Sequence, residues 1–267
     1  MFLNTFARRI VVFIVCTLHM ALSSHLAFAD GVNSKEDIQE SQLSLTELKE
    51  KYPDHFIFHG SNREKTVALT FDDVPDPRYT GKILDILKSE GVPATFFVVG
   101  YKAEAYPSII NRMLQEGHEL GNHTYNHPYL PSLSLESFQS QIDKTDRILM
   151  KLTGKGSNLF RPPYGEVTEE QLLWMIERGM SVVNWNVDSL DWKGISSDEV
   201  IANIFKDIGP GAIVLQHAGG GEGEDLTGTI QALPQIIAAL KREGYTFLTV
   251  SEMVLPQLNG IPRQLWM

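Results

Sequence analysis

The chain has 267 residues, enough for one large domain or two small ones, which excludes a mini-protein held together by disulfides. Its composition, 43% hydrophobic and 21% charged, is too apolar for a disordered chain and too mixed for collagen or a coiled coil. The formal net charge of −10 arises from 33 acidic and 23 basic residues without a basic block, so no nucleic-acid partner is expected.

Residues 1–29 have the pattern of a signal peptide. Arg8 and Arg9 supply a positive start, residues 10–22 form an apolar run, and Ala27 and Ala29 fit a small-residue cleavage site. The apolar run is shorter than the roughly 20 residues of a membrane-spanning helix. We therefore expect a protein secreted to the exterior, cell wall or periplasm after cleavage near Ala29, with an uncleaved membrane anchor as the alternative.

The single cysteine, Cys16, lies inside this segment. Val15 precedes it where a lipoprotein signal has a small residue, so lipidation is not expected. Cleavage would leave a mature chain without disulfides, whose metal-ligating side chains are limited to His, Asp and Glu.

Residues 30–63 form a polar leader with one short helical pattern at Leu45, Leu48 and Tyr52. From Thr66 onward, about seven strand patterns alternate with six helical ones. The expected strands are residues 67–71, 94–99, 119–120, 158–160, 181–187, 212–215 and 245–250. The expected helices are residues 83–90, 109–116, 135–152, 168–178, 198–208 and 229–244.

This alternation predicts an α/β domain over residues 64–256, followed by a tail at 257–267. Repeated β-α units give a parallel sheet with right-handed crossovers. Periodicity does not distinguish a closed barrel from an open doubly wound sheet, but both place ligands at the carboxyl ends of the strands. Polar residues that directly follow a strand are therefore candidates for chemistry.

The first strand ends in Asp72 and Asp73. Two adjacent carboxylates at the end of a buried strand repel each other unless a cation lies between them or one is protonated. The alternative interpretation is an Asx-turn before the proline-rich segment that follows.

A second candidate is the histidine pair His123 and His127, which follows the third strand. Histidines four apart on one helical turn point the same way and suit zinc, although two surface histidines are the alternative. Together with Asp73 they form a two-histidine, one-carboxylate set with open positions, which is typical of catalysis. Such a set also suits Fe(II) oxygenases, but those commonly have all-β barrels, unlike this chain. We expect His118 to interact with a helix C-terminus rather than with a metal.

Three further strand ends carry polar groups. Arg161 is the first residue of the rigid RPPYG segment, and its guanidinium can form a bidentate pair with a carboxylate. The fifth strand leads into DSLDW at 188–192, with two acids and an indole, and the sixth ends in LQH at 215–217. A purely structural explanation has to account for all five strand ends at once, so we favour a catalytic site.

The five segments resemble, in order, the motifs of the polysaccharide deacetylase family, which is named for its NodB homology domain and is also carbohydrate esterase family 4. They are TFDD at 70–73, HTYNH at 123–127, RPPY at 161–164, DSLDW at 188–192 and LQH at 215–217. The resemblance covers residues 64–254. It implies a distorted (β/α) barrel of about seven parallel strands.

The resemblance also implies roles for individual residues. Asp72 is the general base and His217 the general acid, while Asp73, His123 and His127 bind one divalent metal ion. Zinc is expected, with Co²⁺, Ni²⁺ or Mn²⁺ as alternatives.

The remaining motif residues support the reaction or the substrate. Arg161 orients the base, and Tyr164 contributes its backbone N–H to the oxyanion. Trp192 forms a wall of the sugar groove, and Leu215 lines the pocket of the acetyl methyl group. An acid of the fourth motif orients His217 or Arg161. We favour Asp191 for this and leave Asp188 as a supporting residue.

The expected function is thus a secreted, metal-dependent hydrolase that removes N-acetyl groups from glycans containing N-acetylglucosamine or N-acetylmuramic acid, such as peptidoglycan or chitin. The partner is an N-acetylated polysaccharide or oligosaccharide, and we expect a monomer without a stable partner protein. Deacetylation of acetylxylan and non-catalytic glycan binding are the alternatives.

Three further features lead to expectations. The family usually has Gly at the position of Val74, so the loop there is expected to have a different shape. The glycine run at 219–221 predicts a tightly turning or mobile loop beside the groove rather than a phosphate cradle. Trp174 and Trp185 are expected in the core.

Overall fold

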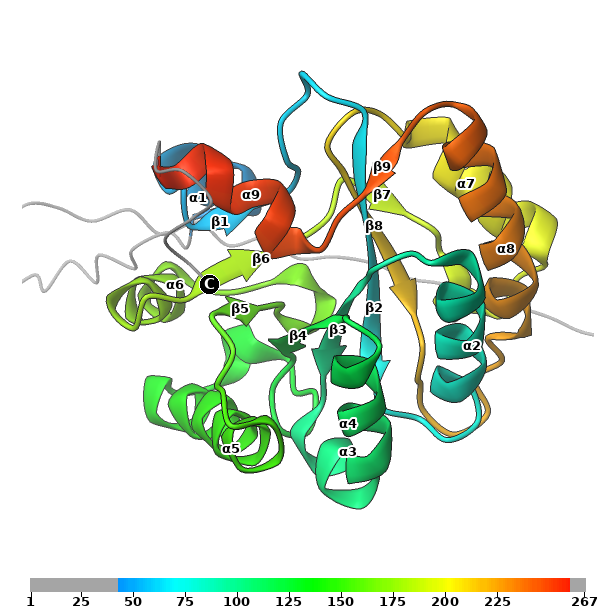
Figure 1. The fold of residues 1–267 in the computed structure, drawn as a ribbon. Coiled ribbons are helices and arrows are strands. Elements are labelled where there is room, and N and C mark those ends of the chain that lie inside the picture. Colours follow the sequence, from blue (N-terminus) through cyan, green and yellow to red (C-terminus); the bar gives the residue numbers. More distant parts are fainter. Residues whose placement is uncertain (1–42, 260–267) are drawn as a thin grey trace, which may run out of the picture. The chain divides into compact units, whose positions relative to one another are not determined.

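The computed structural model describes residues 43–259, and their backbone is built around one curled sheet of parallel strands (Figure 1). The strand order is β1-β6-β5-β4-β3-β2-β8-β7, and β9 pairs with β2. The strands are β1 (Phe56–Ile57), β2 (Thr66–Val74), β3 (Thr95–Val98), β4 (Glu119–Asn122), β5 (Leu159–Phe160), β6 (Ser181–Val183), β7 (Val187–Asp188), β8 (Ala212–His217) and β9 (Thr246–Phe247).

Helices connect the strands. The α-helices are α1 (Leu45–Lys51), α2 (Thr80–Glu90), α3 (Gly100–Ala105), α4 (Pro107–Gln115), α5 (Leu135–Thr153), α6 (Glu169–Glu177), α7 (Ser197–Asp207), α8 (Thr227–Arg242) and α9 (Val250–Asn259). Short 3₁₀ turns are η1 (Leu130–Ser132), η2 (Pro163–Gly165) and η3 (Asp191–Lys193). The predicted distorted (β/α) barrel of parallel strands and helices is confirmed, and its sheet curls into a half-barrel.

Strands β2 and β8 position the site, because they run side by side in register from Val67↔Ala212 to Asp72↔His217. Both are apolar runs buried on both faces, as parallel strands covered by crossover helices require. On the outer face, apolar side chains of α2, α4, α7 and α8 form the largest core cluster. Within it, the rings of Phe71 and Phe96 stack at 5.3 Å between centroids.

The inner face of the curl is filled at one end by α9. Val250 and Met253 of this helix join Ala68, Phe97 and Ile213 in a separate apolar cluster. At the carboxyl ends of β2 and β8 lies a cavity, and the polar side chains of Asp72, Asp73 and His217 gather there.

Two of the predicted strands have the wrong boundaries. The expected strand at 181–187 is divided into β6 and β7, because residues 184–186 leave the ladder. The expected strand at 245–250 is limited to β9, and α9 begins at Val250. Helix α6, in contrast, lies within the predicted range 168–178 and begins with a capping box between Thr168 and Gln171.

The domain starts earlier than the predicted residue 64. Within the polar leader, β1 pairs with β6, and Phe56 and Ile57 are buried. Leu48 of α1 is fully buried in the cluster that also holds Phe138 and Phe160. The three consecutive apolar residues at 56–58 are too short a pattern to identify a strand, which explains why β1 was not predicted.

The expected signal peptide and most of the expected C-terminal tail lie outside the described residues, and α9 continues past the predicted domain end at 256. Among the helices within residues 43–259, none combines the length and apolar character that a bilayer crossing requires.

Phe56→Ala tests whether this leader segment belongs to the folded unit. We expect a loss of about 3 kcal/mol in the free energy of unfolding, because a buried aromatic ring leaves a cavity. Urea unfolding followed by circular dichroism measures the change. The exposed Glu64→Ala serves as a control with an expected change near zero, and equal stability of the two variants would contradict the assignment.

Candidate active site

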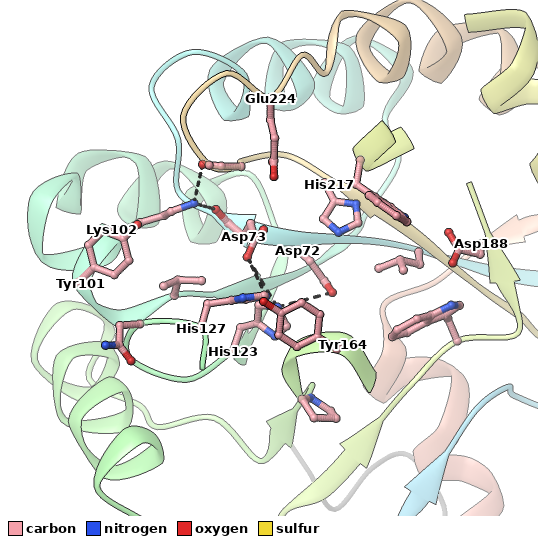
Figure 2. A pocket seen from close by; sticks show the side chains of 18 residues that line it. Asp72, Asp73, Tyr101, Lys102, His123, His127, Tyr164, Asp188, His217 and Glu224 are labelled. Carbon is pink, nitrogen blue, oxygen red and sulfur yellow. Dashed lines mark hydrogen bonds and ion pairs between the residues drawn. The ribbon is translucent and has the colours of Figure 1, made fainter. Parts of the chain in front are cut away.

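Two adjacent aspartates lie at the carboxyl end of β2. In a regular strand, neighbouring side chains point to opposite faces. The pairing of β2 with β3 shifts register between Phe71 and Val74, and Asp73 has a left-handed backbone with φ of 65°. Asp72 and Asp73 therefore line the same pocket (Figure 2). The Asx-turn of this region belongs to Asp76, whose carboxylate accepts the Arg78 N–H.

Val74 causes no distortion of its own. It ends β2 opposite Val98, is fully buried and is not among the residues with positive φ. The left-handed residue is its neighbour Asp73, so a β-branched side chain at position 74 meets no backbone penalty. The backbone argument for an altered loop at Val74 therefore does not apply, and a loop shape different from the family's stays a prediction.

Arg161 is fully buried and holds Asp72 in place. Its Nη1 donates to Asp72 Oδ1 at 2.8 Å and to Thr70 Oγ1 at 2.7 Å. The other guanidinium nitrogens donate to the backbone oxygens of Val183 and Asn184. Burial lowers the pKa of Arg161, while the charge of Asp72 opposes this effect. The predicted Arg161–carboxylate pair is thus present.

Asp73, His123 and His127 converge on one point, and these three residues alone form such a cluster within the described chain. Asp73 Oδ1 lies 3.7 Å from His123 Nε2 and 3.5 Å from His127 Nε2. Asp72 approaches the same nitrogen, with 3.8 Å between its Oδ2 and His123 Nε2. The structure therefore brings together the three residues that the sequence singled out as metal ligands.

The two histidines are not on a helical turn, as their spacing suggested. They lie in the loop after β4, where Thr124 and His127 have left-handed backbones with φ of 69° and 59°. Thr124 N–H donates to Asn122 Oδ1, and His127 N–H donates to Thr124 Oγ1. A second support is Gln141 of α5, which accepts two backbone N–H groups of the same loop.

The protonation of His123 suits a metal ligand. Burial, with the neighbouring His127, lowers the pKa of His123 to about 3, so the ring is neutral. Its Nδ1 lies 2.6 Å from the backbone oxygen of Arg161, which assigns the proton to Nδ1 and leaves the Nε2 lone pair facing Asp73. One carboxylate and two imidazoles within 4.8 Å of one another fit a divalent cation such as zinc.

Hydrogen bonds to the carboxylate of Asp191 hold His217 in place. Asp191 is buried, and its Oδ1 lies 2.8 Å from His217 Nδ1 while its Oδ2 accepts the His217 N–H and the Thr229 hydroxyl. Burial alone would lower the pKa of His217, but the charge of Asp191 and its hydrogen bond raise it to about 9. Of the two partners considered for Asp191, the structure selects His217 over Arg161.

A cavity of about 550 Å³ joins these groups, and the other predicted site residues lie on its wall. Tyr164 and Trp192 are exposed by 63% and 49%, and Leu215 lies on the floor beside His217. Asp188 also lines the cavity, and its Oδ1 accepts the Leu190 N–H. Every residue predicted for the site except the buried Arg161 and Asp191 reaches the cavity.

Trp185 was expected in the core and within a strand. It packs partly buried against the apolar cluster of α9, but it lies between β6 and β7 and also lines the cavity. Nothing in the apolar run at 181–187 indicates the break between β6 and β7, so the strand pattern predicted that Trp185 lies within a strand.

The glycine run at 219–221 forms a tight, anchored loop. A side chain at Gly219 would overlap the backbone oxygen of Asp73. The ammonium of Lys102 donates to the backbone oxygens of Asp73 and Gly220, and Arg78 donates to Gly220 and Gly221. The backbone of this loop therefore packs directly against the backbone of Asp73.

Comparison with known proteins gives consistent matches. The family profile described as polysaccharide deacetylase matches residues 59–183. A peptidoglycan-N-acetylglucosamine deacetylase of Bacillus cereus is 45% identical, over 76% of this chain and 73% of its own length. The peptidoglycan-N-acetylmuramic acid deacetylase PdaA of Bacillus subtilis is 35% identical, over 82% of this chain and 81% of its own.

A solved structure is also similar. It is a peptidoglycan N-acetylglucosamine deacetylase in complex with 4-naphthalen-1-yl-N-oxidanyl-benzamide, with a TM-score of 0.73 and 44% identity. The similarity covers 75% of this chain and 92% of that one.

Arg161→Met tests the buried ion pair. Removal of the guanidinium leaves the Asp72 carboxylate buried without a cation, so we expect the free energy of unfolding to fall by about 3–5 kcal/mol. Guanidinium chloride unfolding measures it. As a control, Lys88→Met breaks an exposed pair with Glu116 and should cost less than about 1 kcal/mol. Similar losses in both variants would contradict the importance of the buried pair.

Proposed function

The chain belongs to the polysaccharide deacetylase family, and from this premise we propose that it removes N-acetyl groups from peptidoglycan sugars by metal-dependent hydrolysis. The observation that carries the proposal is the placement of Asp72 and His217. They are register partners on neighbouring strands and line one cavity together with the Asp73, His123 and His127 cluster. The relatives named above act on peptidoglycan, which supports this polymer over chitin.

Asp73, His123 and His127 would hold the metal ion, with zinc as the expected species and Co²⁺, Ni²⁺ or Mn²⁺ as alternatives. A divalent ion bound there supplies a Lewis acid, which polarises the acetamide carbonyl and makes a bound water more acidic. The inhibitor in the related structure carries a hydroxamic acid group, a chelator of metal ions, and this supports a metal in that enzyme class.

Asp72 acts as the general base. Arg161 occupies its Oδ1, and its Oδ2 faces the side of His123 Nε2, where water and substrate meet the cluster. The base accepts a proton from the attacking water as the bond to the acetamide carbon forms. The backbone N–H of Tyr164 stabilises the oxyanion from the opposite wall.

His217 acts as the general acid. Its Nδ1 proton is held by Asp191, so Nε2 faces the cavity and carries the second proton of the imidazolium. Transfer of this proton to the amide nitrogen turns a poor leaving group into a neutral amine. Leu215 lines the space of the acetyl methyl group, and Trp192 and Trp185 flank the sugar ring.

We also propose that the enzyme is exported. Residues 1–29, which lie outside the described residues, have the signal-peptide pattern, and the substrate polymer is outside the cytoplasmic membrane.

The proposal predicts acetate release from peptidoglycan and N-acetylglucosamine oligomers by the purified, zinc-loaded protein. A chelator should abolish release, and added zinc should restore it. Enzymatic acetate detection, in parallel with acetylxylan, measures activity. Release from acetylxylan alone would favour an O-deacetylase, and glycan binding without any acetate release would favour a non-catalytic protein.

Two variants separate the aspartates in that assay. Asp72→Asn should keep the metal, measured by elemental analysis, and lose at least about a hundredfold in kcat because the base is missing. Asp73→Ala should lose the metal itself. Loss of metal in Asp72→Asn would show that the two roles are reversed.

Asp191→Asn tests the acid. Asp191 stabilises the charged imidazolium, so its neutralisation lowers the pKa of His217, and the proton donor is lost at lower pH. The alkaline limb of kcat against pH should therefore move down by about one to two units. Thr229→Val removes only a hydrogen bond to Asp191 and should move the limb much less. An unmoved limb in Asp191→Asn would exclude His217 as the acid.

A further inference from the structure

Glu224 differs from the other carboxylates of the cavity wall. Asp72 is paired with Arg161, Asp73 belongs to the metal cluster, and Asp188 accepts the Leu190 N–H. Glu224 lines the same cavity, yet its carboxylate has neither a hydrogen bond nor an ion pair with any described residue. Figure 2 shows this carboxylate directed toward the space between Asp73 and His217.

The loop around Glu224 is built to keep it there. The Glu224 carboxylate lies against Gly220, where any side chain at position 220 would overlap with it. The backbone oxygen of Glu224 accepts the Tyr79 hydroxyl at 2.6 Å. Lys102 donates to the Gly220 oxygen and so anchors the preceding turn. The negative charge is therefore held by a fixed backbone rather than by an exposed tip.

The nearest cations are already engaged. Lys102 donates to the backbone oxygens of Asp73 and Gly220. Arg78 forms a bidentate pair with Asp76, and Glu224 adds only a minor contribution to the raised pKa of Arg78. The Glu224 carboxylate thus has no direct ion pair, although the ammonium of Lys102, whose hydrogen-bond partners are neutral carbonyl groups, lines the same cavity.

The two sugars of peptidoglycan differ in the charge that they would bring near Glu224. In N-acetylmuramic acid, a lactyl ether with a carboxylate is attached to the ring carbon next to the one that bears the acetamide. When the acetamide enters the cavity, the lactyl carboxylate must come with it. In N-acetylglucosamine the same carbon bears a neutral hydroxyl group. Like charges in a confined, partly desolvated site repel strongly enough to affect selectivity.

We propose that Glu224 is a specificity-determining residue that disfavours sugars with a free carboxylate beside the reactive acetamide, so that N-acetylglucosamine is preferred over N-acetylmuramic acid with a free lactyl group. The inference rests on the proposed deacetylase function and assigns a sugar to it.

The test uses glycan oligomers from peptidoglycan that are stripped of their peptides. In one preparation the lactyl carboxylates are free, and in the other they are converted to neutral primary amides. Chitotetraose is the reference substrate. Acetate release gives kcat/KM for the zinc-loaded full chain, and mass spectrometry identifies the sugar that loses its acetyl group.

The decisive quantity is the ratio of kcat/KM at the muramyl amide to kcat/KM at the free muramyl acid. We expect a ratio of about ten for the unsubstituted protein, falling toward one in Glu224→Gln. About 0.5 M salt should reduce the ratio as well, because it screens the repulsion. Glu222→Gln removes a charge from the same loop outside the cavity lining and should keep the original ratio.

Each other outcome counts against the inference. An unchanged ratio in Glu224→Gln, or an equal fall in Glu222→Gln, overturns the role of Glu224. Deacetylation of chitotetraose without release from either muramyl form, in both proteins, shows that size rather than charge excludes the lactyl group. Absence of acetate release from every substrate instead refutes the proposed function, and the inference with it.

Discussion

The buried pair of Arg161 and Asp72 is the interaction on which the site depends. The guanidinium reaches across the inside of the curl from β5 to β2, and its remaining donors bind backbone oxygens beside β6. The backbone oxygen of the same residue accepts the His123 ring proton. One residue therefore orients the carboxylate of the proposed base and fixes the tautomer of a proposed metal ligand, which links these two groups through a single side chain and its peptide group.

Two buried histidines have opposite charge states for a related reason. Burial disfavours the imidazolium at both His123 and His217. Only His217 has a buried carboxylate in direct hydrogen-bond contact, and Asp191 reverses the effect of burial there. His123 instead has a carbonyl partner and a second imidazole, which keep it neutral. The partner at Nδ1 thus decides which ring is suited to a metal and which to proton donation.

Much of this arrangement could be predicted from sequence. Membership of the polysaccharide deacetylase family, hydrolysis of amide bonds by a polysaccharide N-deacetylase and the curled α/β fold are all confirmed. These predictions succeeded because buried parallel strands are apolar runs, and the polar residues that follow them must meet at one edge of the sheet. Where the apolar pattern was short, as at β1, the strand was missed. Where it was interrupted, as at Trp185, a residue outside the strands was predicted to lie inside one. Glu224 had no signal, because acids that follow a glycine run, here Glu222, Glu224 and Asp225, look like any solvated loop.

The conformation of the motifs, as opposed to their position, could not be predicted, since it runs against local preference. Five non-glycine residues in the described chain have positive φ, namely Asp73, Thr124, His127, Tyr164 and Leu190, and all lie in or beside the motif segments. A sequence reader expects such backbones at glycine, because other residues are strained there by about 1–3 kcal/mol. Neighbouring groups impose them here. The Leu190 N–H is held by the Asp188 carboxylate, the Thr124 N–H by the Asn122 side chain, and the Asp73 oxygen by the Lys102 ammonium. The motif residues thus identify the chemistry, whereas their geometry is set by tertiary hydrogen bonds that no local pattern records.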